Sequence, residues 1–141
     1  MTTITGKCLC GGVSFEAPLA EHLDACHCDI CRRQVSSPFM GMACHDGITL
    51  TKSDTLVWYD SSDWARRGFC SACGSVLFYN LKGSEFYSVS VGALENPPDT
   101  LVLKEEYFID EKPAFYDFAG DRVRKTGEEV FAAFAGETSN D

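Results

Sequence analysis

The sequence has no long hydrophobic run and few basic residues. No apolar stretch approaches the roughly 18 residues that a membrane-spanning helix requires, and residues 1–7 lack the apolar segment of a secretion signal. Lys and Arg number 12 against 21 Asp and Glu, which gives a formal net charge of -9. This charge disfavours binding to nucleic acid phosphates and to an anionic membrane surface. We therefore expect a cytoplasmic protein that acts on small molecules.

The sequence also lacks low-complexity tracts, internal repeats beyond its cysteine pairs, and any linker that would divide it. Its hydrophobic content of 45% is typical of a globular protein. A length of 141 residues suits one hydrophobic core. We predict a single domain over residues 1–141, with a core of about residues 5–135. The oligomeric state is not indicated.

Short segments with strand patterns make up most of the chain. Val13, Phe15 and Ala17 alternate with polar residues, which is typical of a half-buried strand. Further strands, separated by turn residues, are expected at 39–43, 48–51, 55–59, 75–80, 85–91 and 101–109. This pattern predicts a mainly β fold of short antiparallel strands.

One short C-terminal helix is predicted from a capping box. Thr126 and Glu129 have the Ser/Thr-x-x-Glu spacing in which each residue satisfies a backbone amide of the other. Val130, Phe131 and Phe134 follow at helical spacing on one face.

Two tight cysteine pairs predict a four-cysteine metal site. Cytosolic thiols are kept reduced, so eight cysteines indicate metal ligands more than disulfides. The pairs are Cys8-Leu9-Cys10-Gly11 and Cys70-Ser71-Ala72-Cys73-Gly74. The glycine after each pair allows a turn with positive φ, in which the backbone wraps around a metal. Four thiolates suit tetrahedral zinc and would join distant strands. Free structural cysteines and disulfides are the alternatives.

A third cluster, Cys26-His27-Cys28-Asp29-Ile30-Cys31, offers three sulfur ligands. Structural zinc is normally closed by four protein ligands, whereas catalytic zinc keeps three and leaves one position open. We therefore predict an open metal site. Cys44 is expected to be a small buried residue rather than a fourth ligand. For His27, a position supporting the ligands, an acid–base role and direct ligation all stay open.

The chain contains three motifs, which are Cys8-x-Cys10-Gly-Gly, Cys26-His-Cys28-x-x-Cys31-Arg, and Ser-Ser-Asp-Trp-Ala-Arg-Arg-Gly-Phe-Cys70-x-x-Cys73-Gly-Ser. In order and spacing these motifs resemble those of the glutathione-dependent formaldehyde-activating enzyme family, which is grouped with centromere protein V. The resemblance runs from about Thr5 to Phe118 and includes Ile109-Asp-Glu-Lys-Pro-Ala-Phe-Tyr116.

The resemblance implies a β-tent type fold with two zinc ions. One ion is implied to be structural, on Cys8, Cys10, Cys70 and Cys73, and the other catalytic, on Cys26, Cys28 and Cys31. It further implies formation of S-hydroxymethylglutathione from formaldehyde and glutathione, an activity classed with carbon–sulfur lyases.

The charge of the three-cysteine site indicates which chemistry suits it. Three thiolates already cancel the charge of zinc, so the site favours holding a substrate thiolate over activating water. We expect a small thiol, glutathione in the first place, to add to a small aldehyde, or the reverse cleavage. His27 is the candidate acid–base group, and Arg66 and Arg67 are candidates for binding a substrate carboxylate.

Two other functions remain open. One is a non-catalytic zinc-stapled binding module, whose second site is completed by a residue such as Cys44 or by a partner. The other is an electron-transfer protein, because cysteine pairs also hold iron or iron–sulfur clusters.

Overall fold

The computed structural model describes residues 2–139, and the chain forms two compact units. The first unit comprises Met1–Leu23 and Met40–Val102, and the second comprises Asp24–Phe39 and Leu103–Asp141. In chain order the elements are β1 (Thr3–Lys7), β2 (Val13–Pro18), β3 (His22–Cys26), α1 (Asp29–Val35), β4 (Phe39–Cys44), β5 (Thr49–Ser53), β6 (Leu56–Asp60), β7 (Ala65–Cys70), β8 (Val76–Leu81), β9 (Tyr87–Ser90), the 3-10 turn η1 (Val91–Ala93), β10 (Val102–Tyr107), the 3-10 turn η2 (Ile109–Glu111), β11 (Val123–Lys125) and α2 (Gly127–Ser139). No helix among residues 2–139 is long and apolar enough to cross a membrane.

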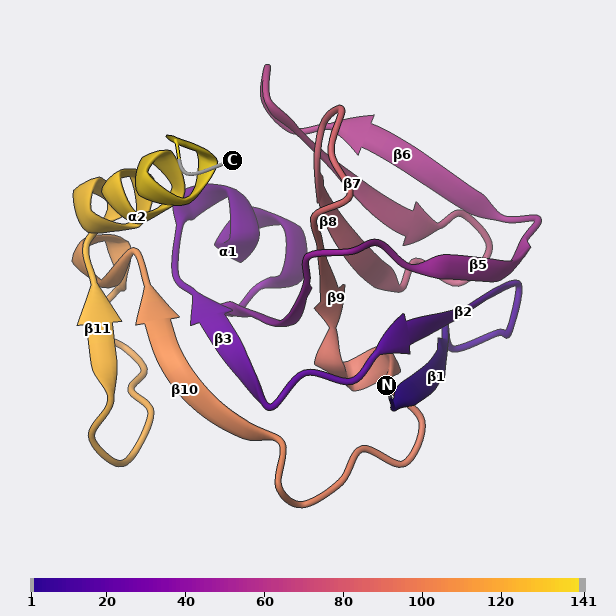
Figure 1. Cartoon of the computed structure of the whole chain (residues 1–141), viewed down its shortest axis with the longest axis horizontal. Helices are drawn as coiled ribbons and strands as arrows, with labels where there is room; N and C mark the ends of the chain where they lie inside the picture. Colours follow the sequence, from indigo (N-terminus) through magenta and orange to yellow (C-terminus); the bar gives the residue numbers. More distant parts are fainter. Residues whose placement is uncertain (1, 140–141) are drawn as a thin grey trace. The chain divides into compact units, whose positions relative to one another are not determined.

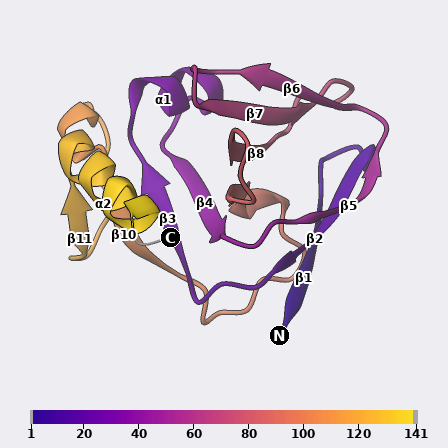
Figure 2. The same ribbon diagram turned by 45° about the horizontal axis from the view of Figure 1, so that its top comes forward.

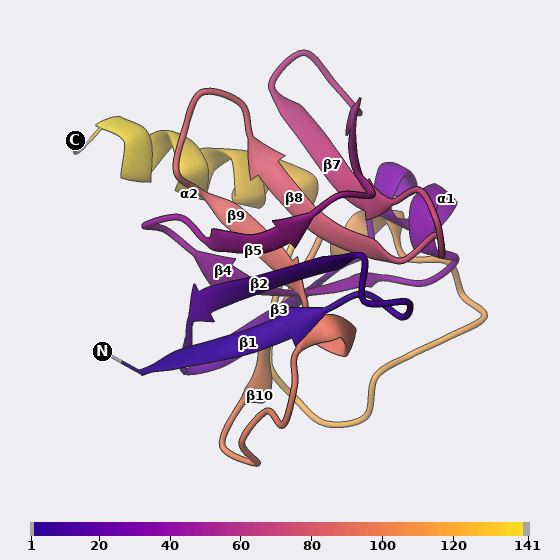
Figure 3. The ribbon, with the colours of Figure 1, turned by 90° about the vertical axis from the view of Figure 1, so that its right-hand side faces the viewer.

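The first unit is built from antiparallel strands in two sheets. Its smaller sheet has the order β1-β2-β5, with β2 in the centre (Figure 3). Its larger sheet has the strand order β4-β9-β8-β7-β6, and Figure 1 labels β6 to β9 of this sheet. The predicted alternation in β2 is confirmed, because Val13, Phe15 and Ala17 are buried and Glu16 is exposed. The mainly β, antiparallel prediction is therefore confirmed.

One hydrophobic cluster forms the core of this unit. Phe15 packs edge-on against Phe78, with ring centroids 5.1 Å apart. Cys44 belongs to this cluster and is 3% exposed, so its predicted burial is confirmed. Burial raises the pKa of the Cys44 thiol to about 11. Cys44 is therefore a neutral core residue near pH 7.

Gly6 in β1 has no room for a side chain. It pairs with Phe15 in β2, and a Cβ atom on Gly6 would lie 2.2 Å from the Cζ atom of the Phe15 ring. Gly6→Ala should therefore lower the free energy of unfolding by about 1–3 kcal/mol through overpacking. Denaturant unfolding measures the change. Gly92→Ala is the matched control, since its Cβ would meet nothing closer than 4.0 Å, and equal losses in the two variants would contradict the prediction.

The second unit combines three strands with two helices. Its strands have the order β11-β10-β3, and β10 pairs with β11 in parallel (Figure 2). The predicted capping box at the start of α2 is confirmed: the Glu129 amide donates to Thr126 Oγ1 at 3.2 Å, and the Thr126 amide donates to Glu129 Oε1 at 2.9 Å. Asp110 Oδ1 also accepts the Gly127 amide at 2.9 Å and joins α2 to η2.

Candidate metal centres

Four cysteines of the first unit converge on one point. Within residues 2–139, the Sγ atoms of Cys8, Cys10, Cys70 and Cys73 all lie within 4.8 Å of one another. The separations from Cys8 to Cys10 and from Cys10 to Cys70 are both 3.7 Å. A tetrahedral zinc with Zn–S bonds of about 2.3 Å requires sulfur–sulfur distances of about 3.8 Å. The four thiols therefore fit a zinc ion in number, chemistry and spacing.

Two glycine turns place these sulfurs. Gly11 and Gly74 have φ values of 81° and 80°, as predicted from their positions after the cysteine pairs. In each turn backbone amides point at sulfur: the Val13 amide donates to Cys8 Sγ at 3.3 Å, and the Cys73 amide donates to Cys70 Sγ at 3.5 Å. These amides stabilise thiolates, as a metal site requires.

Hydroxyl groups also favour the thiolate forms of Cys70 and Cys73 in the second turn. Hydrogen bonds from Ser75 lower the pKa of the Cys73 thiol to about 5. The Thr55 hydroxyl, 3.1 Å from Cys70 Sγ, lowers the pKa of that thiol. Thiolates are the form of cysteine that binds metal, so this turn is partly preorganised.

The second cluster lies where β3 meets α1. Cys26 ends β3, and the Cys28 sulfur caps α1 by accepting the Cys31 amide at 3.4 Å. Residues three apart lie on one face of a helix, so the sulfurs of Cys28 and Cys31 lie on the same side of α1. An ion pair of 3.1 Å between Asp29 and Arg33 supports the short helix.

These three cysteines form an open ligand set. Their Sγ atoms lie within 4.8 Å of one another, and no His, Cys, Asp or Glu of the described residues joins the group as a fourth ligand. Hydrogen bonds with Cys28 and Cys31, together with burial, raise the pKa of the Cys26 thiol well above its usual range. Crowded sulfurs of this kind cannot all ionise unless a cation neutralises them. The set therefore fits a metal ion that retains one free position.

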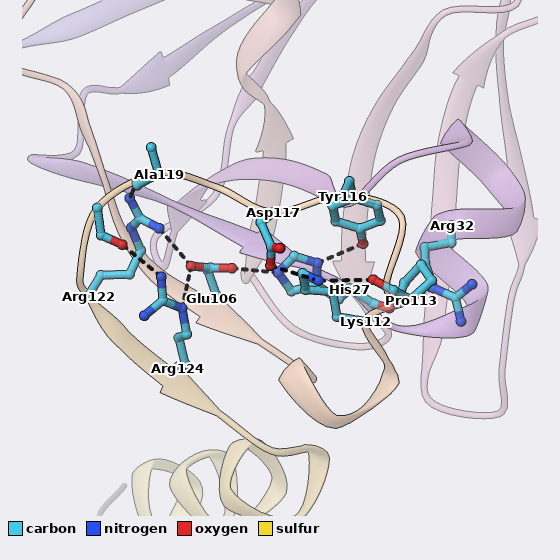
Figure 4. Close-up of polar contacts among 11 residues, drawn as sticks. His27, Arg32, Glu106, Lys112, Pro113, Tyr116, Asp117, Ala119, Arg122 and Arg124 are labelled. Carbon is cyan, nitrogen blue, oxygen red and sulfur yellow. Dashed lines mark hydrogen bonds and ion pairs between the residues drawn. The ribbon is translucent and has the colours of Figure 1, made fainter.

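The His27 side chain lies in a buried polar network (Figure 4). Its side chain is fully buried, and its Nε2 atom lies 2.8 Å from Glu106 Oε1. Its Nδ1 atom lies 2.7 Å from the hydroxyl of Tyr116. Glu106 Oε2 in turn accepts hydrogen bonds from Arg122 Nη1 at 2.7 Å and Arg124 Nε at 2.9 Å. Both ring nitrogens of His27 therefore have partners in this network, and the roles predicted for His27 stay predictions.

Glu106 is ionised in this network. Burial alone would raise the pKa of its carboxyl, but hydrogen bonds from Arg122 and His27 and the charge of Arg124 lower the pKa below its usual range. The residue is 1% exposed, so its charge is balanced by these partners rather than by water.

The segment that contains Tyr116 is held by contacts of Lys112. Lys112 Nζ forms an ion pair with Asp117 at 2.9 Å and donates to the Pro113 carbonyl at 2.9 Å. Arg32 Nε donates to the carbonyl of His27 at 2.9 Å. Figure 4 shows Tyr116 and Arg32 near His27.

Arg66 and Arg67 belong to β7, and both are engaged within the first unit. Arg66 donates from Nε to Asn80 Oδ1 at 2.9 Å, and its guanidinium lies 4.0 Å from the centroid of the Trp58 ring. Arg67 is 5% exposed and donates to Ser61 Oγ at 3.3 Å. Their predicted contact with substrate stays a prediction.

Sequence reasoning missed Glu106, Arg122 and Arg124. A glutamate in a short strand carries no signal of its own, and the arginine partners of Glu106 lie 16 and 18 residues further along the chain. Tyr116 ends the C-terminal motif identified above, so that motif was the available signal for it.

The chain is similar to known proteins over most of its length. Residues 3–111 match the family model described as glutathione-dependent formaldehyde-activating enzyme. An uncharacterized lyase of Schizosaccharomyces pombe is 32% identical over 132 residues, which cover 92% of this chain and 96% of that protein. A crystal structure of a Rhodobacter sphaeroides protein has a similar fold, with a TM-score of 0.58 and 23% identity, covering 72% of this chain and all of the other.

Proposed function

Because the chain belongs to the glutathione-dependent formaldehyde-activating enzyme family, we propose that it is a carbon–sulfur lyase-type enzyme that uses zinc. Its substrates would be a thiol, glutathione in the first place, and a small aldehyde such as formaldehyde. The lyase name of the S. pombe relative supports the reaction class. The observation that carries the proposal is the three-thiol cluster without a fourth ligand among the described residues.

Both cysteine clusters have a part in this proposal. Cys8, Cys10, Cys70 and Cys73 would hold a structural zinc that joins the strands of the first unit. At Cys26, Cys28 and Cys31, zinc would supply a fourth position at which the substrate sulfur stays a thiolate near pH 7.

The remaining steps concern the substrate and the protein side chains. In the forward direction a sulfur–carbon bond forms, the carbonyl π electrons move to oxygen, and this oxygen takes up a proton. The predicted acid–base role of His27 would be exerted through Tyr116, because both ring nitrogens of His27 are hydrogen bonded. Arg66 and Arg67 remain proposed contacts for a glutathione carboxylate.

Metal analysis combined with a glutathione titration tests the proposal. Protein purified without chelator should contain two zinc ions per chain and bind glutathione. Cys31→Ala should retain one zinc ion and lose both glutathione binding and the acceleration of S-hydroxymethylglutathione formation, measured by nuclear magnetic resonance (NMR). Arg66→Gln should keep both ions and bind glutathione more weakly.

Cys44→Ala is the matched control, since Cys44 is buried but belongs to neither cluster. It should keep both zinc ions and full activity. Two zinc ions without glutathione binding would favour the binding module, and iron with visible absorbance would favour electron transfer. Either result would overturn the proposal.

A further inference from the structure

Strand β6 lies at one end of the larger sheet of the first unit. It pairs with β7 in five antiparallel residue pairs without a register shift (Figure 1). Among the described residues, no backbone hydrogen bond outside this pairing involves residues 56–60. The edge of β6 that faces away from β7 therefore carries main-chain N–H and C=O groups that only water or another strand can satisfy.

The smaller sheet of the same unit has protected edges. On β1, the Thr5 carbonyl accepts the Glu95 amide at 2.9 Å. β5 carries Lys52 and has a register shift in its pairing with β2. Covering segments, lysines and irregular pairing are the means by which proteins keep sheet edges from pairing with other chains. β6 has the sequence Leu-Val-Trp-Tyr-Asp, with no lysine, proline or bulge, so its edge is open to another strand.

The side chains of β6 divide between the core and the solvent. Trp58 stacks on Phe78 with ring centroids 6.0 Å apart, and the Arg66 guanidinium lies 4.0 Å from the centroid of the same indole. These contacts hold the strand in place, so a partner strand would not have to order it first. Val57 and Tyr59 lie on the opposite face of the strand and are 40% and 64% exposed. Two large apolar side chains are thus left in water beside the open edge.

An antiparallel pair of two β6 strands would satisfy this edge and cover these side chains together. With Trp58 on the twofold axis all five residues pair, and Val57 of each strand lies opposite Tyr59 of the other. Cross-strand pairs of an aromatic and a β-branched residue stabilise sheets, and the twofold axis repeats this pair. Both strands use their open edge in the contact, so association ends at a dimer.

The charges at the two ends of β6 do not oppose this pairing. Lys82 lies 3.4 Å from Asp60 at one end, and Lys52 lies 3.9 Å from Asp54 at the other. In the antiparallel register each formally neutral couple meets the other couple of the partner strand. At long range the formal charge of -9 on each chain still opposes approach. A five-residue edge is also smaller than a standard interface of about 800 Å² per partner, so we expect a weak dimer.

We propose that the edge of β6 is a docking surface for a second copy of this chain, in a weak antiparallel β6–β6 dimer. The inference is independent of the proposed function. Sedimentation velocity of the full chain, purified without chelator, tests it at about 10 μM to 1 mM, where weak interfaces associate. The wild-type protein should shift from monomer to dimer across this range. A monomer throughout would overturn the inference and would favour an extended segment of a different protein as the occupant.

Val57→Lys should stay a monomer over the same range, because it places a charged side chain in both Val57–Tyr59 pairs. Leu50→Lys is the matched control. Leu50 is also 40% exposed and lies on an edge strand, and its substitution changes the net charge equally. This variant should dimerise as the wild type does. A dimer that persists in Val57→Lys, or that is lost in both variants, would contradict the β6 interface.

Amide hydrogen exchange of the wild-type protein does not depend on the folding of any variant. The amides of β6 that face away from β7 should exchange more slowly as the protein concentration rises, while those of β5 should be unaffected. Dimer formation without slower exchange in β6 would place the interface elsewhere and overturn the inference.

The salt dependence distinguishes strand pairing from an interface of ion pairs. Raising the ionic strength from about 0.1 M to 1 M shortens the screening length from about 10 Å to 3 Å. Association should become stronger, because salt screens the repulsion between two chains of charge -9. Weaker association at the higher ionic strength would indicate an interface of ion pairs and would contradict the proposal.

Discussion

Cys70→Ala should abolish cooperative folding of the first unit near room temperature. Cys70 is fully buried, and its sulfur lies 3.7 Å from that of Cys10 in the four-cysteine cluster. In zinc-finger peptides, structural zinc contributes about 10–16 kcal/mol of apparent binding free energy. The whole stability of a domain is about 5–15 kcal/mol, so losing this site removes most of it. Thermal unfolding followed by near-ultraviolet circular dichroism measures the loss.

Cys44→Ala separates the metal effect from the packing effect. Cys44 is buried in the same core cluster, but outside the four-cysteine group. Its replacement should cost only about 1 kcal/mol, a usual value for a small core truncation. A chelator should lower the melting temperature of the wild-type protein and of Cys44→Ala alike, while barely changing that of Cys70→Ala. Similar stability of the two variants would show that the cluster does not hold the fold together.

The cysteine turns could be predicted because each depends on residues that are close together in the sequence. Each cysteine pair is closed by its own turn, and the glycine that follows it predicts the positive φ that Gly11 and Gly74 adopt. The capping box of α2 was predictable for the same reason, since Thr126 and Glu129 are three residues apart. The prediction of one domain over residues 1–141 stays a prediction.

Elements whose partners are distant in sequence were missed. β1 contains two threonines and one glycine among its five residues, which blur its hydrophobic alternation, and it is a strand because β2 pairs with it along its whole length. β3 is a short strand that ends at Cys26. β11 has only three residues, which pair in parallel with β10. The role of Glu106 could not be predicted either, because it depends on a contact with His27, which is 79 residues away in the sequence.

Glu106→Gln should destabilise the second unit by about 3–5 kcal/mol. Glu106 is 1% exposed and accepts hydrogen bonds from two arginines, and Arg122 is itself only 13% exposed. Removing one partner of a buried ion pair leaves the other charge without compensation, and this accounts for the size of the effect. Glu105→Gln is the matched control on the neighbouring, more exposed position of β10, where the loss should stay below about 1 kcal/mol.

The pH dependence distinguishes a charge effect from a packing effect at Glu106. Its carboxyl has a lowered pKa in the folded protein because the bonds from Arg122 and His27 outweigh burial. Such a group stabilises the fold above its unfolded pKa of about 4.3, and this contribution is lost as the pH falls through the lower folded value. The stability difference between wild type and Glu106→Gln, measured by urea unfolding, should therefore be constant near pH 7 and shrink below about pH 4. A difference that stays constant through that range would mean that the buried shape of Glu106, and not its charge, holds the network.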